Sequence, residues 1–244
     1  MDVPLEKLEF ALVAQGLRAR DLLAQPYLEV GCGDGFNLEQ FSRLGMRGMG
    51  IDISPEAIAL VRDKQLKHTE VVSGDFLAMS EVSPPKTIFM LNILEHVHED
   101  EAFLKKAAAI LPPGGYLVIA VPGNPEAYGF ADANAGHIRR YSRAELRQKI
   151  VDAGLVVDEW LDVGFPVNRM YTWGFNLLNR NRSQVPHEEQ TLTSGIRHKD
   201  GYYGGGFDVL ARIAFPILCG VIQLDRLFVH TQLGNNFVVF AKKL

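Results

Sequence analysis

The 244-residue sequence has few cysteines and no excess of basic charge, and each absence excludes a class of protein. Because Cys32 and Cys219 lie far apart, thiols alone can form neither a disulfide framework nor a CxxC metal site. This cysteine usage fits a reducing cytoplasm, where we expect the protein to reside. The 25 basic and 29 acidic residues give a formal net charge of -4, which would not attract a polyanion, so we expect no nucleic-acid partner.

Membrane-directing segments are also lacking. The N-terminal residues include Asp2, Glu6 and Glu9 among apolar side chains, without the basic segment of a secretory signal. The longest apolar stretch, Ile213 to Leu224, is about half as long as a membrane-spanning helix. We therefore expect no transmembrane segment, while a peripheral membrane contact and a homodimer stay open.

What is present is a regular alternation of strand and helix patterns. Short apolar runs predict strands at residues 27–30, 48–53, 70–73, 87–91, 116–121, 156–163 and 237–242. Apolar periodicity and capping residues predict helices at residues 5–23, 36–44, 55–64, 100–110 and 142–153. Such alternation builds βαβ units, so we predict the α/β class: a doubly wound, Rossmann-like, seven-stranded and mostly parallel sheet.

One domain, 1–244, accounts for the pattern. Its predicted parts are a leading helix in 1–25, a cofactor-binding core at 26–165, a helical or loop insertion or lid at 166–234, and a last strand in 235–244. Apolar residues of the insertion, at 170–175 and 207–228, have two interpretations. In the first, they pack in the core of the protein or form a dimer contact. In the second, they form an apolar substrate slot under a lid that is hinged at Tyr202–Gly206.

The turn after the first predicted strand is rich in glycine. Gly31, Gly33 and Gly35 let the main chain approach a ligand closely, and Asp52 ends the second strand, where a carboxylate can accept hydrogen bonds from both ribose hydroxyls of a nucleoside. A plain tight turn or a phosphate cradle has similar glycines, and a nicotinamide enzyme has the same acid. The GxGxG spacing and the carboxylate of Glu29 before the turn favour a cationic methyl donor over a pyrophosphate.

At these residues the chain resembles the class I S-adenosylmethionine-dependent methyltransferases. Glu29–Gly35 is similar to the family's first motif and Asp52 to its ribose acid, while Gly74–Phe76 resembles the segment that receives the adenine amino group and covers the ring. Asn92–Val97 and Leu111–Gly115 resemble the motifs that flank the segment between the fourth and fifth strands. The resemblance implies S-adenosyl-L-methionine as the cofactor.

The cofactor-binding residues that we expect combine this resemblance with the glycine turn. They are Glu29, Gly31, Cys32, Gly33, Asp34, Gly35, Asn37, Asp52, Ile53, Gly74, Asp75, Phe76, Asn92 and Ile93. Two of them have a plain structural alternative, because Asp75 suits a turn and Asn92 suits a helix cap.

Gly136–Ser142, with the sequence GHIRRYS, resembles a subgroup broadly akin to the ubiquinone-type O-methyltransferases. Its place after the fifth strand implies a substrate role. The substrate-binding residues that we expect are His96, Tyr128, His137, Arg140 and Tyr141.

His96 and His137 are also the candidate catalytic residues, because imidazole exchanges protons at neutral pH. The alternative for His96 is a hydrogen bond to a backbone carbonyl, and methyl transfer from a sulfonium can proceed without a base. Within Glu95–Glu99, His96 and His98 are two residues apart and cannot share one helix face, so we expect no metal site.

Together these features predict an S-adenosylmethionine-dependent methyltransferase that acts on a small-molecule or lipid-like acceptor, with oxygen preferred by resemblance alone. The alternative is a non-catalytic S-adenosylmethionine-binding or partner- or membrane-binding module on the same fold. A nicotinamide oxidoreductase is a third interpretation.

Overall fold

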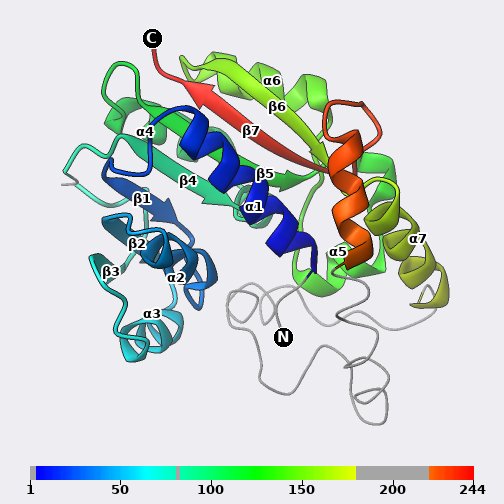
Figure 1. Ribbon diagram of the computed structural model, residues 1–244, viewed down its shortest axis with the longest axis horizontal. Helices are drawn as coiled ribbons and strands as arrows, with labels where there is room; N and C mark the ends of the chain where they lie inside the picture. Colours follow the sequence, from blue (N-terminus) through cyan, green and yellow to red (C-terminus); the bar gives the residue numbers. More distant parts are fainter. Residues whose placement is uncertain (1–3, 81–82, 180–219) are drawn as a thin grey trace.

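The computed structural model describes residues 4–80, 83–179 and 220–244. Within them seven strands form one sheet in the order β3-β2-β1-β4-β5-β7-β6 (Figure 1). The strands are β1 (Tyr27–Val30), β2 (Gly48–Asp52), β3 (Thr69–Ser73), β4 (Thr87–Leu91), β5 (Tyr116–Pro122), β6 (Val156–Val163) and β7 (Asn236–Lys242). Only β7 runs antiparallel to its neighbours. The predicted class, with a seven-stranded and mostly parallel sheet, is confirmed.

Helices cover both faces of the sheet. One apolar core lies under α1 (Pro4–Ala19), α2 (Phe36–Arg43) and α3 (Pro55–Asp63), and the other lies under α4 (Asp100–Ile110) and α6 (Arg143–Asp152). β4 serves both cores, since Phe89 belongs to the first and Ile88 and Met90 to the second. A strand buried on both faces reads as a continuous apolar run, which is why the sequence marks β4 so clearly.

The strand order reverses between β1 and β4. The chain leaves β1 toward β2 on one side and β4 toward β5 on the other, as the sheet order shows. Gly31 therefore follows β1 and Asn92 follows β4 at the same edge of the sheet. In doubly wound sheets ligands bind at this switch point, beyond the carboxyl ends of the strands.

The remaining described helices lie near that edge. They are η1 (Leu94–His96), η2 (Pro125–Ala127), α5 (Phe130–Ala135), α7 (Val167–Asn179) and η3 (Ile222–Phe228). Figure 1 shows α5 and α7 beside each other, and the Asn176 side chain accepts a hydrogen bond from the Ala131 N–H at 2.9 Å. The predicted hinge at Tyr202–Gly206 and the apolar residues at 207–219 lie outside the described residues.

Two differences from the sequence predictions have local causes. The leading helix ends at Ala19 rather than Leu23, and the chain then turns through Asp21 at φ 54°, although Leu22 is still buried. α5 was not predicted, because its six residues, FADANA, carry no apolar periodicity.

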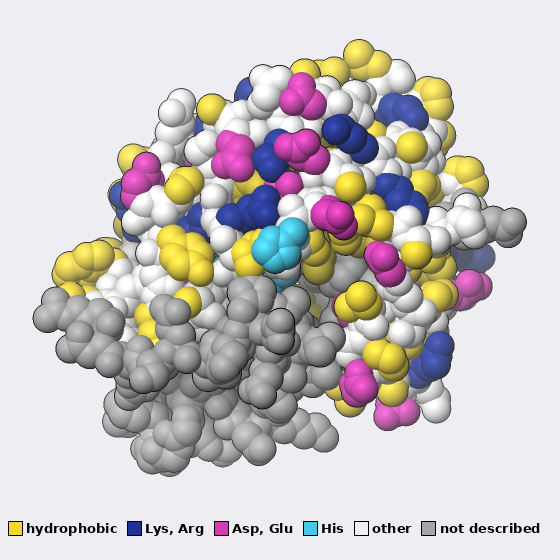
Figure 2. Space-filling model, turned by 180° about the vertical axis from the view of Figure 1, so that it is seen from behind, with side chains coloured by type: hydrophobic (Ala, Val, Ile, Leu, Met, Phe, Trp, Pro, Cys, Tyr) yellow, Lys and Arg dark blue, Asp and Glu magenta, His cyan; other side chains and the backbone are white. Residues whose placement is uncertain are grey.

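The helices and the surface charges were compared with the prediction that the chain has no transmembrane segment. None of the described helices has the length and apolarity needed to cross a bilayer. Figure 2 shows acidic and basic side chains interspersed on the face opposite to that of Figure 1. A mixed surface of this kind agrees with the small net charge of -4.

Candidate cofactor and acceptor site

The glycine turn after β1 requires glycine at two positions. Gly31 and Gly35 have φ of 72° and 78°, in the left-handed region that favours glycine. A Cβ at Gly31 would lie 2.6 Å from Cδ1 of Ile93, and one at Gly35 would lie 2.8 Å from Cγ2 of Val61. The turn therefore packs directly against α3 and against the segment after β4, with no room for side chains.

Asp52 is fixed at the end of β2 by two backbone donors. Its Oδ2 accepts the N–H of Gly33 at 2.7 Å, and its Oδ1 accepts the N–H of Ser54 at 2.9 Å. Each carboxylate oxygen has a second lone pair, which suits a vicinal pair of ribose hydroxyls. Ile53 follows, is 66% exposed, and offers an apolar surface beside this carboxylate.

Glu29 lies beneath the glycine turn and is almost wholly buried. Its Oε1 accepts a hydrogen bond from Nδ2 of Asn37 at 2.8 Å, whereas Oε2 has no hydrogen-bond partner among the described residues. Burial raises the pKa of Glu29 to about 8, although the Asn37 hydrogen bond opposes this rise. A buried carboxylate oxygen without a partner is costly, so a bound cation would be stabilised here.

The remaining residues of the turn differ in their exposure. Cys32 is buried, and burial raises the pKa of its thiol. Such a thiol is unreactive, so Cys32 contributes its backbone and its packing. Asp34 is half-buried at the outer side of the turn.

The segment after β3 shows what Asp75 and Phe76 contact. The N–H of Gly74 donates to the Asp52 carbonyl at 2.9 Å, which ties this segment to the end of β2. Oδ1 of Asp75 accepts the N–H of Leu77 at 2.8 Å, so the turn interpretation describes part of its role, while its side chain is exposed and open to a ligand. Phe76 is only 3% exposed and packs on Phe103 in the second core.

Asn92 connects the end of β4 to α1. It has a φ of 56°, and its Nδ2 donates to Oε2 of Glu9 at 3.2 Å rather than capping a helix. Oε1 of Glu9 accepts Nδ2 of Asn236 at 2.8 Å, and burial raises the pKa of Glu9 to about 7. Sequence reasoning missed Glu9 as a site residue; its only signal was an acid among the apolar positions of a helix.

The two predicted catalytic histidines lie together. The rings of His96 and His137 are 4.9 Å apart between centroids, edge to face. Nδ1 of His96 lies 3.1 Å from the Gly136 carbonyl, as the alternative interpretation of this residue predicted. Nδ1 of His137 lies 2.9 Å from Oδ1 of Asp132, a residue that the sequence did not indicate.

Glu95 closes this group from inside the protein. It is 0% exposed, and neither carboxylate oxygen has a hydrogen-bond partner among the described residues. Oε1 of Glu95 lies 3.9 Å from Nε2 of His137, and burial raises the pKa of Glu95 to about 7. The carboxyl group thus faces the edge of the imidazole that is not bonded to Asp132.

Among the described residues, Glu95, His96 and His137 form a group whose side chains could together hold a metal ion. One ligand atom from each can be chosen so that all lie within 4.8 Å of one another. The sequence argument paired His96 with His98 and so found no shared face, whereas the fold brings in His137 from a later segment. The absence of a metal stays a prediction.

The five predicted substrate contacts divide into two groups. Tyr128 is 44% exposed, and its hydroxyl donates to the His137 carbonyl at 2.7 Å. Tyr141 is fully buried, with its hydroxyl 2.8 Å from Oδ2 of Asp100. The Arg140 side chain is 6% exposed and bonds to Asp132. The described contacts of Arg140 and Tyr141 therefore lie inside the protein, whereas we expected both to face the substrate.

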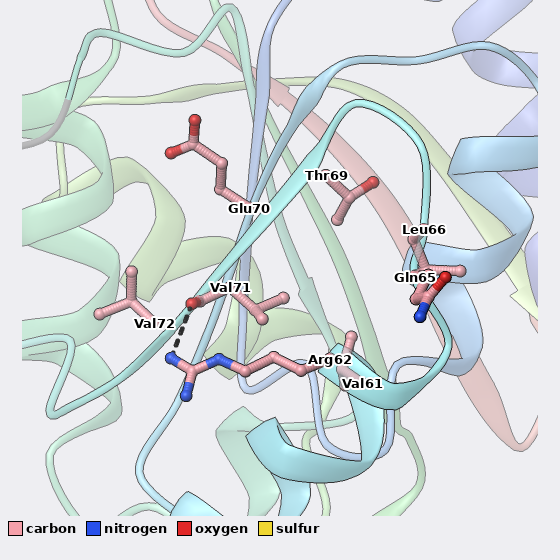
Figure 3. Close-up of a pocket in the computed structure, with 8 residues that line it drawn as sticks. All are labelled: Val61, Arg62, Gln65, Leu66, Thr69, Glu70, Val71 and Val72. Atoms are coloured by element: carbon pink, nitrogen blue, oxygen red, sulfur yellow. Dashed lines mark hydrogen bonds between the residues drawn. The ribbon is translucent and has the colours of Figure 1, made fainter.

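A separate hollow of about 420 Å³ lies between α3 and β3 (Figure 3). Arg62 spans it, with Nη2 donating to the Val71 carbonyl at 3.4 Å. Because β3 is the outer strand of the sheet, this hollow lies away from the switch point and is not the candidate site.

Comparison with known families and proteins gives a consistent result. A family model described as a methyltransferase domain matches residues 7–159. A ubiquinone biosynthesis O-methyltransferase of Rhodopseudomonas palustris (strain HaA2) is 28% identical over 148 residues, which cover 54% of this chain and 58% of that protein. The chain thus spans a little over half the length of this curated relative.

Solved structures show the same fold. The magnesium protoporphyrin IX methyltransferase of Synechocystis PCC 6803, with bound SAH, has a TM-score of 0.54 at 17% identity and covers 64% of this chain and 75% of its own. The N-methyltransferase NodS of Bradyrhizobium japonicum WM9 has a TM-score of 0.52 at 21% identity, over 66% of this chain and 88% of its own.

Proposed function

The chain belongs to the methyltransferase-domain family, and from this premise we propose that it transfers a methyl group to a hydroxyl oxygen of a small-molecule or lipid-like acceptor. The cofactor that the family supports is S-adenosyl-L-methionine, which supplies an electrophilic methyl group on a sulfonium. We also propose a cytoplasmic location, on the cysteine usage alone.

The observation that carries this proposal is the set of carboxyl groups near the carboxyl ends of β1 and β2, beside the switch point of the sheet. Asp52 presents a fixed carboxylate at the ribose position, and Glu29 presents a buried oxygen without a partner. Both groups suit a cationic nucleoside, whereas they would repel a pyrophosphate. The glycines at Gly31 and Gly35 let this turn pack closely on Ile93 and Val61, which fixes its backbone beside the two carboxyl groups.

We propose the following roles for the predicted cofactor residues; Phe76, which we expected to cover the adenine ring, instead packs in the second core. Asp52 would hold the ribose, Glu29 and the glycine turn the amino-acid part, and Ile53 with Asp75 the adenine. Asn92 and Ile93 would border the methyl-bearing end, on the side where His96 follows β4. The chain's own contribution to the reaction is then to hold both reactants in line, which can lower a barrier by roughly 7–11 kcal/mol.

The acceptor side rests on the histidine pair and on nearby apolar surface. A hydroxyl acceptor gives up a proton as the new carbon–oxygen bond forms, and an imidazole beside it can take that proton. The name of the Rhodopseudomonas relative supports oxygen as the attacking atom. On α7 the side chains of Met170, Trp173 and Leu178 are 71%, 69% and 84% exposed, which supports an acceptor with apolar character.

Binding and turnover test the proposal separately. Calorimetric titration of the purified chain with S-adenosylmethionine and with NAD should show binding of the first alone. Incubation with methyl-labelled cofactor and a cell extract, followed by mass spectrometry, should then yield a methylated product. Binding without any product would favour the non-catalytic module, and binding of NAD alone would favour an oxidoreductase.

A further inference from the structure

His137 is held by a carboxylate whose surroundings fix its charge. Oδ1 of Asp132 lies 2.9 Å from Nδ1 of His137 and accepts Nε of Arg140 at 2.7 Å, while Oδ2 accepts the N–H of Gly129 at 3.0 Å. Burial by itself would raise the pKa of Asp132, but the His137 hydrogen bond and the Arg140 guanidinium hold it below its usual range. Asp132 is therefore an anion that is 1% exposed.

An ionised carboxylate can only accept hydrogen bonds, so Nδ1 of His137 must carry the proton that lies between them. Nε2 is then the nitrogen that gains or loses a proton. The His137 side chain is 18% exposed, whereas Asp132 and Glu95 on either side of it are closed to solvent. Of these three groups, His137 is the one that an acceptor molecule can reach.

We propose that Asp132 is the positioning residue of a carboxylate–imidazole pair, and that His137 Nε2 is the proton acceptor for the acceptor hydroxyl. The inference deepens the proposed methyl transfer and rests on it. As the carbon–sulfur bond breaks and the carbon–oxygen bond forms, the hydroxyl proton passes to Nε2 of His137. The products are S-adenosylhomocysteine, a methyl ether and an imidazolium, which later returns its proton to water.

Every element around His137 fits this assignment. Asp132 comes from α5, and Glu95 and His96 come from η1. The carboxyl group of Glu95, 3.9 Å from Nε2, stabilises the positive charge that the ring acquires. Tyr128 fixes the backbone of the same residue by donating to the His137 carbonyl. Arg140, which we expected to bind substrate, instead keeps Asp132 ionised.

A purely structural role for Asp132 is the main competitor, because its Oδ2 also accepts the N–H of Gly129 at the start of α5. Asp132→Asn separates the two roles. An asparagine keeps the size of the side chain and one oxygen that can accept a hydrogen bond, but it carries no negative charge to stabilise the imidazolium of His137. Asp162→Asn is the matched control, since it breaks another buried Asp–Arg pair, with Arg143, that does not contact His137.

Nitrogen NMR of histidine-labelled full-length protein reads the tautomer without any substrate. Neutral His137, assigned with a His137→Gln variant, should carry its proton on Nδ1 in the wild type and in Asp162→Asn. In Asp132→Ala, which removes the acceptor from Nδ1, the proton should lie on Nε2, on the side of Glu95. A wild-type ring protonated on Nε2, or a tautomer that Asp132→Ala leaves unchanged, would overturn the inference whether or not the enzyme turns over.

Kinetics with catechol and alkyl-substituted catechols as probes test the catalytic consequence. Their phenolic hydroxyls, with a pKa near that of tyrosine, about 10, can share a proton with imidazole. Asp132→Asn should lower kcat by about 10²–10⁴-fold, the contribution of a general base, with the cofactor Kd and the acceptor KM within about threefold of wild type. Asp132→Glu should recover part of kcat, and Asp162→Asn should lose stability alone.

The two proposals fail in different ways. Absence of cofactor binding, or of turnover by the wild type on these probes and in the extract, would count against methyl transfer, while the NMR result still decides the tautomer. Normal turnover by Asp132→Asn in an enzyme whose wild type is active would reject the positioning role alone.

Discussion

The affinity for S-adenosylmethionine should rise with pH because of Glu29. In the free protein burial raises the pKa of this carboxyl group to about 8, so at about pH 6 only about 1% of molecules carry the ionised form that attracts a cation. At about pH 7.5 the ionised fraction is about one quarter. If only the ionised form binds well, the apparent affinity scales with this fraction and should increase by about 25-fold over that range.

The sign follows from which form the ligand favours. A bound cation stabilises the carboxylate and lowers the pKa of Glu29, so binding below about pH 8 releases a proton. Isothermal titration calorimetry in buffers of different ionisation enthalpy measures both the affinity and that proton. The upper limit of about pH 7.5 keeps more than half of the ligand's own ammonium groups protonated, because free α-amino groups titrate at about 7.7–8.0 or above.

Two variants test the origin of the pH dependence. Glu29→Gln keeps an oxygen for the Asn37 hydrogen bond but cannot ionise, so it should bind at least about tenfold more weakly at pH 7.5 and show no pH dependence. Glu39→Gln, on the exposed side of α2 where Glu39 pairs with Arg43, should keep the wild-type slope. A flat wild-type profile, or a Glu29→Gln profile that still rises, would refute the assignment of Glu29 to the cation.

Three further substitutions follow from the same structure. Asp52→Ala should weaken S-adenosylmethionine binding by about 100-fold, as expected when charged hydrogen bonds worth about 1.5–3 kcal/mol are lost, and unchanged calorimetric affinity would exclude the ribose role. Folding raises the pKa of Glu95 from 4.5 to about 7, so burial of its carboxylate costs no stability below pH 4.5 and increasingly more up to about pH 7. Denaturant titrations of Glu95→Gln should therefore give a free energy of unfolding about 3 kcal/mol above that of the wild type at pH 8 and equal to it in acid. Gly35→Ala should lower the free energy of unfolding by more than the roughly 1–2 kcal/mol of a left-handed conformation, because its Cβ would meet Val61 at 2.8 Å. Gly45→Ala, with φ 75° and nothing within 4 Å of its Cβ, should lose that conformational part alone, and equal denaturant midpoints for the two variants would contradict this.

The elements with strong local signals were predicted closely. β1, β4, α4 and β6 have the predicted bounds, because each has an apolar pattern that ends at turn residues such as Gly31, Pro112 or Gly164. The two predicted serine caps are confirmed, since Oγ of Ser54 accepts the N–H of Ala57 and Oγ of Ser142 accepts the N–H of Glu145, both at 3.1 Å. Each cap depends only on residues within three positions of the serine, so it can be predicted from the sequence alone.

The contacts of the acceptor side depend on the fold and could not be predicted in the same way. Asp132 lies in a six-residue helix without apolar periodicity. Arg140 and His137 contact its buried carboxylate, and they reach it only after the chain has turned at Gly136. His137 meets Glu95 from a segment 42 positions later in the chain. A motif such as GHIRRYS marks the region as functional, but it does not say which of its side chains face inward.

The sequence analysis inferred a cationic ligand from the carboxylate of Glu29, and the structure adds two more buried glutamates to this argument. Glu9 on α1, Glu29 on β1 and Glu95 on η1 belong to different elements, and burial raises the pKa of each to between about 7 and about 8. Glu95 also contributes to the raised pKa of Glu9, so these two acids sense each other through the protein. Near neutral pH each additional negative charge here costs free energy, and the cost falls only if a cation enters. An anionic pyrophosphate would increase it, which supports the proposal of a positively charged cofactor.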